Sequence, residues 1–190
     1  MEAFSQRFII FSFIAVAAYI VVRAFSVKRT TARGGHWWRL WMVAAAALIF
    51  LVRRGGTAAP RVLQSTLWAR SFPVMLTTDV LVLLGVVVVV WARSTLGRNW
   101  SANVVLKEDH EIIARGPYAY VRHPMYSGTL LMMVGAVMFF ANAAVCIVAV
   151  LFALGLVFKA REEEKLLARR LPETYPAYKA RTKMLIPFVL

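Results

Sequence analysis

Long apolar runs alternate with short polar segments along the 190-residue chain. Three such runs occupy the N-terminal half, namely Phe8 to Val27, Trp37 to Val52 and Val74 to Ala92. A backbone in lipid must satisfy its own hydrogen bonds, and a helix does so locally. About 20 apolar residues are enough for a helix to cross the hydrocarbon core. The pattern therefore predicts three membrane-spanning helices within residues 1–92.

A fourth apolar stretch, Ser127 to Phe158, contains no charged residue. As one helix it would be about 48 Å long, against a hydrocarbon core of about 30 Å. Two helices of about 24 Å each, joined by a tight turn in "FFANAA" around Asn142, leave less apolar surface in water. This hairpin brings the total to five. The predicted fold is an all-α polytopic membrane protein with about five transmembrane helices, followed by a C-terminal cytoplasmic helix and tail, in a single domain of residues 1–190.

Composition supports lipid as part of the solvent. Hydrophobic residues make up 61% of the chain and the mean hydropathy is +0.66, whereas soluble domains average about 45–50% apolar residues. The single cysteine, Cys146, lies in an apolar run, which excludes a disulfide framework and a thiolate metal site. Nucleotide-binding, zinc-protease and paired-cysteine motifs are absent from the sequence, so no metal site is predicted.

The net charge of +14 is distributed around the apolar runs. The basic residues form no single stripe, so membrane lipids are the predicted surroundings and no nucleic-acid partner is expected. Most basic residues fall in segments 23–39, 93–122 and 159–183, which the positive-inside rule assigns to the cytoplasm. In a bacterium the membrane would be the inner one. Four arginines on the opposite side are unexplained by this orientation: Arg53, Arg54, Arg61 and Arg70.

The segment "EDHEIIARGPYAYVRHPMYSG" precedes the uncharged hairpin. Gly116-Pro117 indicates a turn, and Pro124 suits the first turn of the following helix. Arg122 and His123 would then lie at a helix start, within reach of lipid headgroups. A plain alternative is an interfacial anchor, with the tyrosines as belt aromatics and Arg122 on a lipid phosphate.

The segment "FKAREEEKLLARR" follows the hairpin, and Lys159 to Leu171 is predicted to be a helix that leaves the membrane. Its three consecutive glutamates, 162–164, are 100° apart around a helix, so at least one should point towards the protein and another towards water. The alternative is a solvated charge run, in which a Lys159–Glu163 pair contributes only about 0.2–0.5 kcal/mol. Asp79, within the third apolar run, is a functional candidate or an interfacial residue, with equal weight.

In this order, "GPYAYVRHPMY", an uncharged hairpin, "EEEKLL" and "YPAYKARTKMLIP" resemble the isoprenylcysteine carboxyl methyltransferase family. That family is recognised by an R-H-P-x-Y motif followed by a paired glutamate. Its relatives include phospholipid N-methyltransferases and other short bacterial membrane methyltransferases. The resemblance extends from about Leu96 to the C-terminus, and it makes residues 93–190 a cofactor-binding loop, helical hairpin and C-terminal segment.

The resemblance implies S-adenosylmethionine as cofactor, held between the cytoplasmic ends of the last two spans and the C-terminal segment. It assigns Lys159 to the position where the eukaryotic enzymes bind the substrate carboxylate with an arginine, and Arg122 is a second substrate-binding candidate. Lysine is a point charge and cannot make a bidentate fork. No catalytic residue is firmly assigned. The implied cofactor contacts are His110, Glu111, Ile112, Ile113, Tyr118, His123, Pro124, Met125, Tyr126 and Glu163.

These residue types suit the implied chemistry, because a carboxylate can hold an ammonium group and aromatic faces favour a sulfonium. A carboxylate acceptor is already ionised at neutral pH, whereas an amine acceptor would need a base such as His123. The expected function is an S-adenosylmethionine-dependent methyltransferase acting on a lipophilic or prenylated acceptor, most like carboxyl O-methylation of an isoprenylated cysteine. Phospholipid N-methylation, S-methylation of a lipophilic thiol and a non-catalytic membrane subunit are the alternatives. The oligomeric state stays open.

Overall fold

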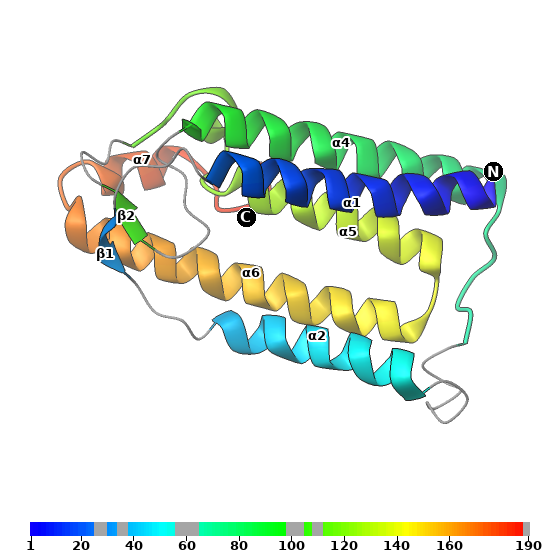
Figure 1. Ribbon diagram of the computed structural model, residues 1–190. Helices are drawn as coiled ribbons and strands as arrows, with labels where there is room; N and C mark the ends of the chain where they lie inside the picture. The colour runs from blue at the N-terminus through cyan, green and yellow to red at the C-terminus, as the bar shows by residue number, and fades with distance from the viewer. Residues whose placement is uncertain (25–29, 34–37, 56–64, 98–104, 108–111, 188–190) are drawn as a thin grey trace.

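The chain is described by a computed structural model for residues 1–24, 30–33, 38–55, 65–97, 105–107 and 112–187. Within these residues, five long helices run lengthwise and consecutive ones point in opposite directions (Figure 1). They are α1 (Glu2–Ala24), α2 (Trp38–Gly55), α4 (Phe72–Leu96), α5 (Pro124–Phe140) and α6 (Ala143–Arg170). The alternation places the motif and the C-terminal segment at one end, called here the motif end. The N-terminus and the α5–α6 turn lie at the other, the far end (Figure 1).

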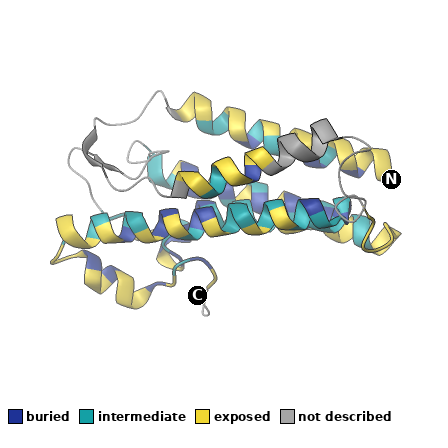
Figure 2. Cartoon of the chain, turned by 90° about the horizontal axis from the view of Figure 1, so that it is seen from below, coloured by how far each residue is buried: buried dark blue, intermediate teal, exposed yellow. Residues whose placement is uncertain are grey.

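Three of these helices are long and apolar enough to cross a membrane. They are α1, α4 and α6. Helix α5 is apolar but shorter, with 17 residues, or about 25 Å of helix. The membrane character is therefore confirmed, and the count of five spans stays a prediction. Exposed apolar side chains such as Phe11, Leu83 and Val150 give these helices surfaces suited to lipid (Figure 2).

Helices α4 and α5 pack together closely because glycines line their contact. A Cβ atom on Gly85 would lie 2.6 Å from the carbonyl oxygen of Gly128, and one on Gly128 would lie 2.8 Å from that of Gly85. Such small residues let two backbones approach closely inside a membrane. Helix α1 packs on α4, and α2 packs along α6, which gives two groups of helices (Figure 1).

The predicted hairpin turn is confirmed at residues 141–142. Helix α5 ends at Phe140, Ala141 adopts a left-handed conformation with φ of 49°, and Asn142 caps α6. The Asn142 side chain accepts a hydrogen bond of 3.0 Å from the backbone N–H of Val145. This bond satisfies one of the otherwise unpaired donors in the first turn of α6.

The segment before α4 closes the far end of the bundle. The Arg70 Nε donates to the carbonyl oxygen of Phe139 at 3.0 Å, and the indole of Trp68 donates to that of Met138 at 2.8 Å. Arg70 also forms an ion pair with Glu2. These contacts satisfy backbone carbonyls at the end of α5. They also give a structural role to Arg70, one of the four arginines that the predicted orientation left unexplained. The side chains of residues 53, 54 and 61 lie outside the described part of the chain.

Two features add to the predicted helical architecture. At the motif end, β1 (Thr30–Arg33) and β2 (Val105–Lys107) form an antiparallel pair, so two connections between helices contact each other. Backbone groups outside helices need partners, and pairing supplies them. Within the bundle, the Ser5 hydroxyl donates to Asp79 Oδ2 at 2.8 Å. Asp79 therefore links α4 to α1.

Candidate functional site

The R-H-P-M-Y motif lies at the start of α5 and is held there by the C-terminal segment. A 3-10 helix, η3 (Gly116–Ala119), precedes it and begins at Gly116 with φ of 59°. His123 is the N-cap residue of α5, and Pro124 occupies its first turn as predicted. The backbone N–H groups of Arg122 and His123 donate to the carbonyl oxygens of Lys183 and Met184, at 2.8 and 3.1 Å. The residues before α5 and the C-terminal segment thus lie side by side and are joined by backbone hydrogen bonds.

The three glutamates near the end of α6 have three different environments. Glu162 pairs with Lys165 at 2.8 Å, and that lysine is exposed to water. Glu163 accepts a hydrogen bond of 2.8 Å from the phenol of Tyr126. Glu164 is buried among cations. This arrangement follows from the 100° spacing of helical residues. One glutamate, Glu164, faces the protein, whereas Glu162 and Glu163 are both partly exposed, at 25% and 21%.

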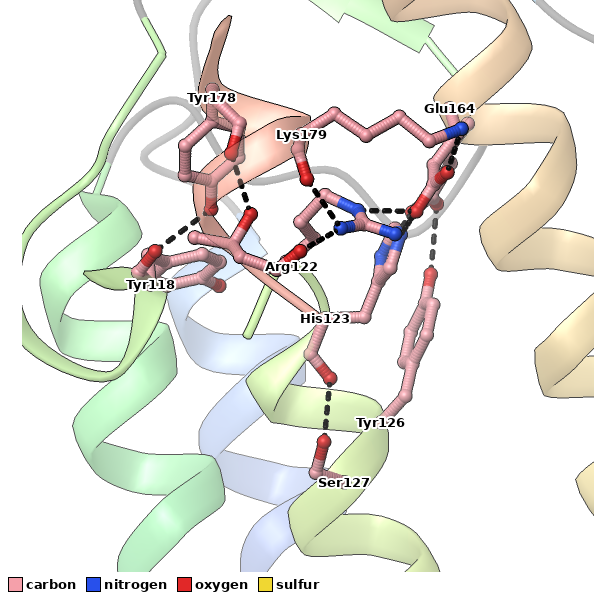
Figure 3. A network of polar contacts seen from close by, with 10 residues as sticks. Tyr118, Arg122, His123, Tyr126, Ser127, Glu164, Tyr178 and Lys179 are labelled. Atoms are coloured by element: carbon pink, nitrogen blue, oxygen red, sulfur yellow. Dashed lines mark hydrogen bonds and ion pairs between the residues drawn. The ribbon is translucent and has the colours of Figure 1, made fainter. Parts of the chain in front are cut away.

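Glu164 is the centre of a buried ionic cluster (Figure 3). Its Oε1 lies 2.6 Å from Arg122 Nε, and its Oε2 lies 3.0 Å from Lys179 Nζ. The Arg122 guanidinium also donates to the backbone carbonyl oxygens of Thr182 and Lys179. Because buried charges are costly unless paired, these contacts stabilise the position of both side chains.

His123 lies between two carboxylates. Its Nδ1 is 3.5 Å from Glu163 Oε2, and its Nε2 is 3.5 Å from Glu164 Oε1. The imidazole is buried and stacks parallel to the Tyr126 ring, with 5.3 Å between the centroids. Burial lowers the pKa of His123, but the nearby carboxylates of Glu163 and Glu164 raise it more, so the net shift is upward. The protonated imidazolium is therefore favoured over the neutral form.

Lys159 lies one helical turn before Glu163 on α6 and is largely buried. Its Nζ is 5.2 Å from the centroid of the Tyr126 ring, a distance at which the ring face attracts a cation. One aromatic side chain thus contacts Lys159 and Glu163 of α6 and also His123, the residue before α5.

The C-terminal helix α7 (Tyr175–Arg181) packs over the residues before the motif. The Tyr178 phenol donates to the carbonyl oxygen of Tyr118 at 2.9 Å, and the Thr182 hydroxyl donates to that of Tyr178 at 2.8 Å (Figure 3). Burial raises the pKa of Tyr178 to about 12, which keeps this donor protonated. Both bonds are buried, and the first one attaches α7 to η3 while the second lies within the end of α7.

Most of the predicted site residues lie together at the motif end. Ile113, Tyr118, Met125 and Tyr126 belong to one apolar cluster. Five more predicted site residues lie beside this cluster: Arg122, His123, Pro124, Lys159 and Glu163. Ile112 is half-buried just before η3. His110 and Glu111 lie outside the described residues. The sequence analysis did not predict three residues of this site: Tyr178, Lys179 and Thr182. The only sequence feature that pointed to them was the segment rich in tyrosine and lysine that contains them.

Together, the fold and the site define a helical membrane protein with a charged site at one end of its bundle. Residues 76–169, about half of the chain, match the model of the Isoprenylcysteine carboxyl methyltransferase (ICMT) family and belong to that family. The resemblance inferred from the motifs is therefore confirmed. Residues 76–169 include the motif, the hairpin and all three glutamates.

A solved structure shares the fold. The eukaryotic intramembrane Ras methyltransferase ICMT (isoprenylcysteine carboxyl methyltransferase) matches with a TM-score of 0.53 and 19% sequence identity. The match covers 82% of this chain and 55% of that one. The shared architecture therefore extends beyond the matched family region, into the N-terminal helices.

Three curated bacterial proteins are similar in part. "Uncharacterized protein YpbQ" of Bacillus subtilis is 28% identical over 78 residues, which is 40% of this chain and 46% of that protein. The cobalt-zinc-cadmium resistance protein CzcN of Cupriavidus metallidurans is 32% identical over 50% of this chain and 44% of its own. The nickel-cobalt-cadmium resistance protein NccN of Alcaligenes xylosoxydans xylosoxydans is 33% identical over 50% and 45%. Each match spans less than half of the relative.

Proposed function

We propose that this chain is an S-adenosylmethionine-dependent membrane methyltransferase. Its acceptor is lipophilic, and the reaction most resembles carboxyl O-methylation of an isoprenylated cysteine. The observation that carries the proposal is the contact of Glu163 with Tyr126 and His123, in the region that matches the family. It joins the two sequence motifs of the family into one site at one end of the membrane bundle.

The residues present fit this cofactor. Glu163 keeps 21% of its side chain exposed, against 9% for Glu164, and is thus the more accessible carboxylate for an ammonium group. The aromatic rings of Tyr126 and His123 suit a positively charged sulfur, and Ile113 and Tyr118 offer apolar surface nearby. When bound, the cofactor would supply a methyl group whose bond to sulfur breaks as the acceptor bonds to its carbon. Contacts by His110 and Glu111 stay a prediction.

The charges around His123 support an acceptor that needs no base. Because two carboxylates raise the pKa of His123, they favour its protonated form, which cannot act as a base. A carboxylate acceptor is already ionised there, so the chain needs only to bind and orient it. An amine acceptor would have to lose a proton first. This observation favours O-methylation over N-methylation.

Lys159 is the better supported of the two proposed substrate-binding cations. Its ammonium group lies against the Tyr126 ring, beside the proposed cofactor site. The Arg122 guanidinium already contacts Glu164 and two backbone carbonyl oxygens. An anionic headgroup placed near Lys159 would lie at the end of the bundle, on the side that we propose is cytoplasmic, with its lipid chain in the bilayer.

The test is methyl transfer from tritiated S-adenosylmethionine by the purified protein in lipid, with a farnesylated cysteine analogue and total bacterial lipids as acceptors. Label that mild base releases would identify a methyl ester and support the proposal. Base-stable label in the lipid fraction would assign an N- or S-methyltransferase instead. No label, together with no binding of the donor, would refute the enzyme and favour a non-catalytic membrane subunit.

A further inference from the structure

Glu163 and Glu164 are neighbours in sequence, but only Glu163 faces the proposed cofactor site. Both oxygens of Glu164 are engaged by cations: Oε1 by Arg122 at 2.6 Å and Oε2 by Lys179 at 3.0 Å. Oε1 also lies 3.5 Å from His123 Nε2. With 9% of its side chain exposed, Glu164 has little surface left for a ligand.

The contacts of Glu164 join three separate segments of the chain. Glu164 belongs to α6, Arg122 precedes α5, and Lys179 belongs to α7. Arg122 extends the link, because its side chain donates to Thr182 and its backbone N–H donates to Lys183. The C-terminal segment is thus attached to the motif by backbone bonds and to α6 by charges.

His123 connects this cluster to the cofactor side. Its two ring nitrogens lie at the same distance, 3.5 Å, from a carboxylate oxygen of Glu163 and one of Glu164. A shift of Glu164 would leave the imidazole with one carboxylate instead of two. The imidazole also stacks on Tyr126, the hydrogen-bond donor to Glu163, so its orientation affects both groups around Glu163.

We propose that Glu164 is a positioning residue. With Arg122 and Lys179 it fastens α7 and residues 182–185 across the motif, and through His123 it fixes the carboxylate of Glu163. The inference rests on the proposed function in one respect, because it takes Glu163 as the group that binds the methyl donor. Glu164 itself touches neither donor nor acceptor.

The physical basis is the cost of an unpaired buried charge. Glu164→Gln keeps the size of the side chain but removes its charge, which leaves Arg122 buried without a carboxylate. The loss should loosen the C-terminal segment, which then keeps its backbone hydrogen bonds to the motif and the side-chain hydrogen bonds of Arg122, Ser127 and Tyr178. Glu162→Gln is the matched control, because Glu162 pairs only with the exposed Lys165 in the described contacts.

Two measurements on the full chain in detergent test the role: donor affinity by titration calorimetry, and tryptic cleavage after Lys179, Arg181 and Lys183 by mass spectrometry. Glu164→Gln should weaken donor binding about tenfold or more and speed these cleavages. At saturating donor its kcat should change little while the KM for the donor rises. Glu162→Gln should change none of these values. Glu163→Gln should weaken donor binding by roughly 10- to 150-fold without faster cleavage.

Several outcomes would overturn the role. Unchanged donor affinity in Glu164→Gln would refute it, and so would weaker binding without faster cleavage, since Glu164 would then contact the donor directly. If Glu164→Gln fails to fold, Arg122→Lys replaces it, because lysine keeps the charge but loses the planar fork. Arg122→Lys should show weaker donor binding and faster cleavage, each to a smaller extent. If it shows neither, the result counts against the role. If the unaltered chain binds no donor, the proposed function fails, and the cleavage rates alone then decide whether Glu164 fastens the segment.

Discussion

The two ends of the bundle are closed in different ways. At the far end, the α5–α6 turn is covered by donors that satisfy backbone carbonyls, and its ion pair, Arg70 with Glu2, is partly exposed. At the motif end, Glu164, Arg122 and His123 form charged contacts that are nearly inaccessible to water. The first end is thus closed by an indole and a guanidinium on backbone carbonyls, without a buried ion pair.

Burying a charge costs free energy unless the charge is paired. Closing the motif end with buried charges therefore requires more compensating contacts than closing the far end. The far end also uses a cation, Arg70, but its ion pair with Glu2 is partly exposed. A buried ionic cluster is therefore the feature that distinguishes the motif end, where we propose that the donor binds. If this comparison is right, substitutions at the two ends should separate donor affinity from stability.

The largest expected effect is on donor binding in Glu163→Gln. The substitution removes the carboxylate proposed to hold the ammonium group of S-adenosylmethionine, while leaving a hydrogen-bond acceptor for Tyr126. Loss of a charged hydrogen bond of about 1.5–3 kcal/mol corresponds to roughly 10- to 150-fold weaker binding. Titration calorimetry would measure it, and the melting temperature should stay close to that of the unaltered chain. Full donor affinity in this variant would remove Glu163 from the site.

A smaller effect is expected for Tyr126→Phe. The phenol donates to Glu163 at 2.8 Å, and its loss removes one constraint on the carboxylate but keeps the ring on which Lys159 and His123 lie. A hydrogen bond to a charged group contributes about 1.5–3 kcal/mol. Because this one acts on the donor only through the position of Glu163, donor affinity should fall by less, about 5- to 30-fold. Tyr120→Phe is the control, because that tyrosine is exposed. Equal effects in the two variants would contradict a specific role for Tyr126.

A substitution at the far end should change the stability of the chain but not its affinity for the donor. Asn142→Ala removes the side-chain acceptor that caps α6, which should reduce the free energy of unfolding by about 1 kcal/mol. Asn142→Asp keeps the acceptor and should stay near the original stability. Thermal unfolding in detergent measures both variants, and donor affinity should be the same in each. A loss of donor affinity in Asn142→Ala would show that the two ends are coupled.

Local patterns in the sequence predicted much of the site. The turn at Asn142, the place of Pro124 in the first turn of α5 and the division of the three glutamates all follow from short-range helical geometry. Hydropathy located the membrane helices but not their ends. Helix α6 continues without a break from Ala143 to Arg170, because Glu, Lys and Arg are as good helix formers as apolar residues.

The contacts between distant segments could not be predicted in this way. Arg122 meets Thr182 and Lys179 only because the chain turns back after α6 and lays α7 beside the motif. The partner of Asp79, Ser5 of α1, and the pairing of β1 with β2 likewise depend on how the helices are arranged. No periodicity within one segment encodes these contacts, since each depends on two segments meeting.

The smallest expected effect is a dependence of stability on pH that comes from the motif end. The pKa of His123 is raised above its ordinary value of 6.5, so the protonated imidazole stabilises the folded chain. This contribution is complete below about pH 6.5 and is lost as the pH rises through the higher pKa of the folded state. The melting temperature should therefore fall over this range, and less steeply in His123→Gln.

The far end supplies the control for this titration. Asn142→Ala lowers the melting temperature without touching His123, so its decline with pH should run parallel to that of the unaltered chain. A melting temperature that rises as the pH approaches 6.5 from below and then levels off in the unaltered chain, but not in His123→Gln, would mean that burial outweighs the two carboxylates. His123 would then be neutral and available as a base, and an amine acceptor would become the better assignment.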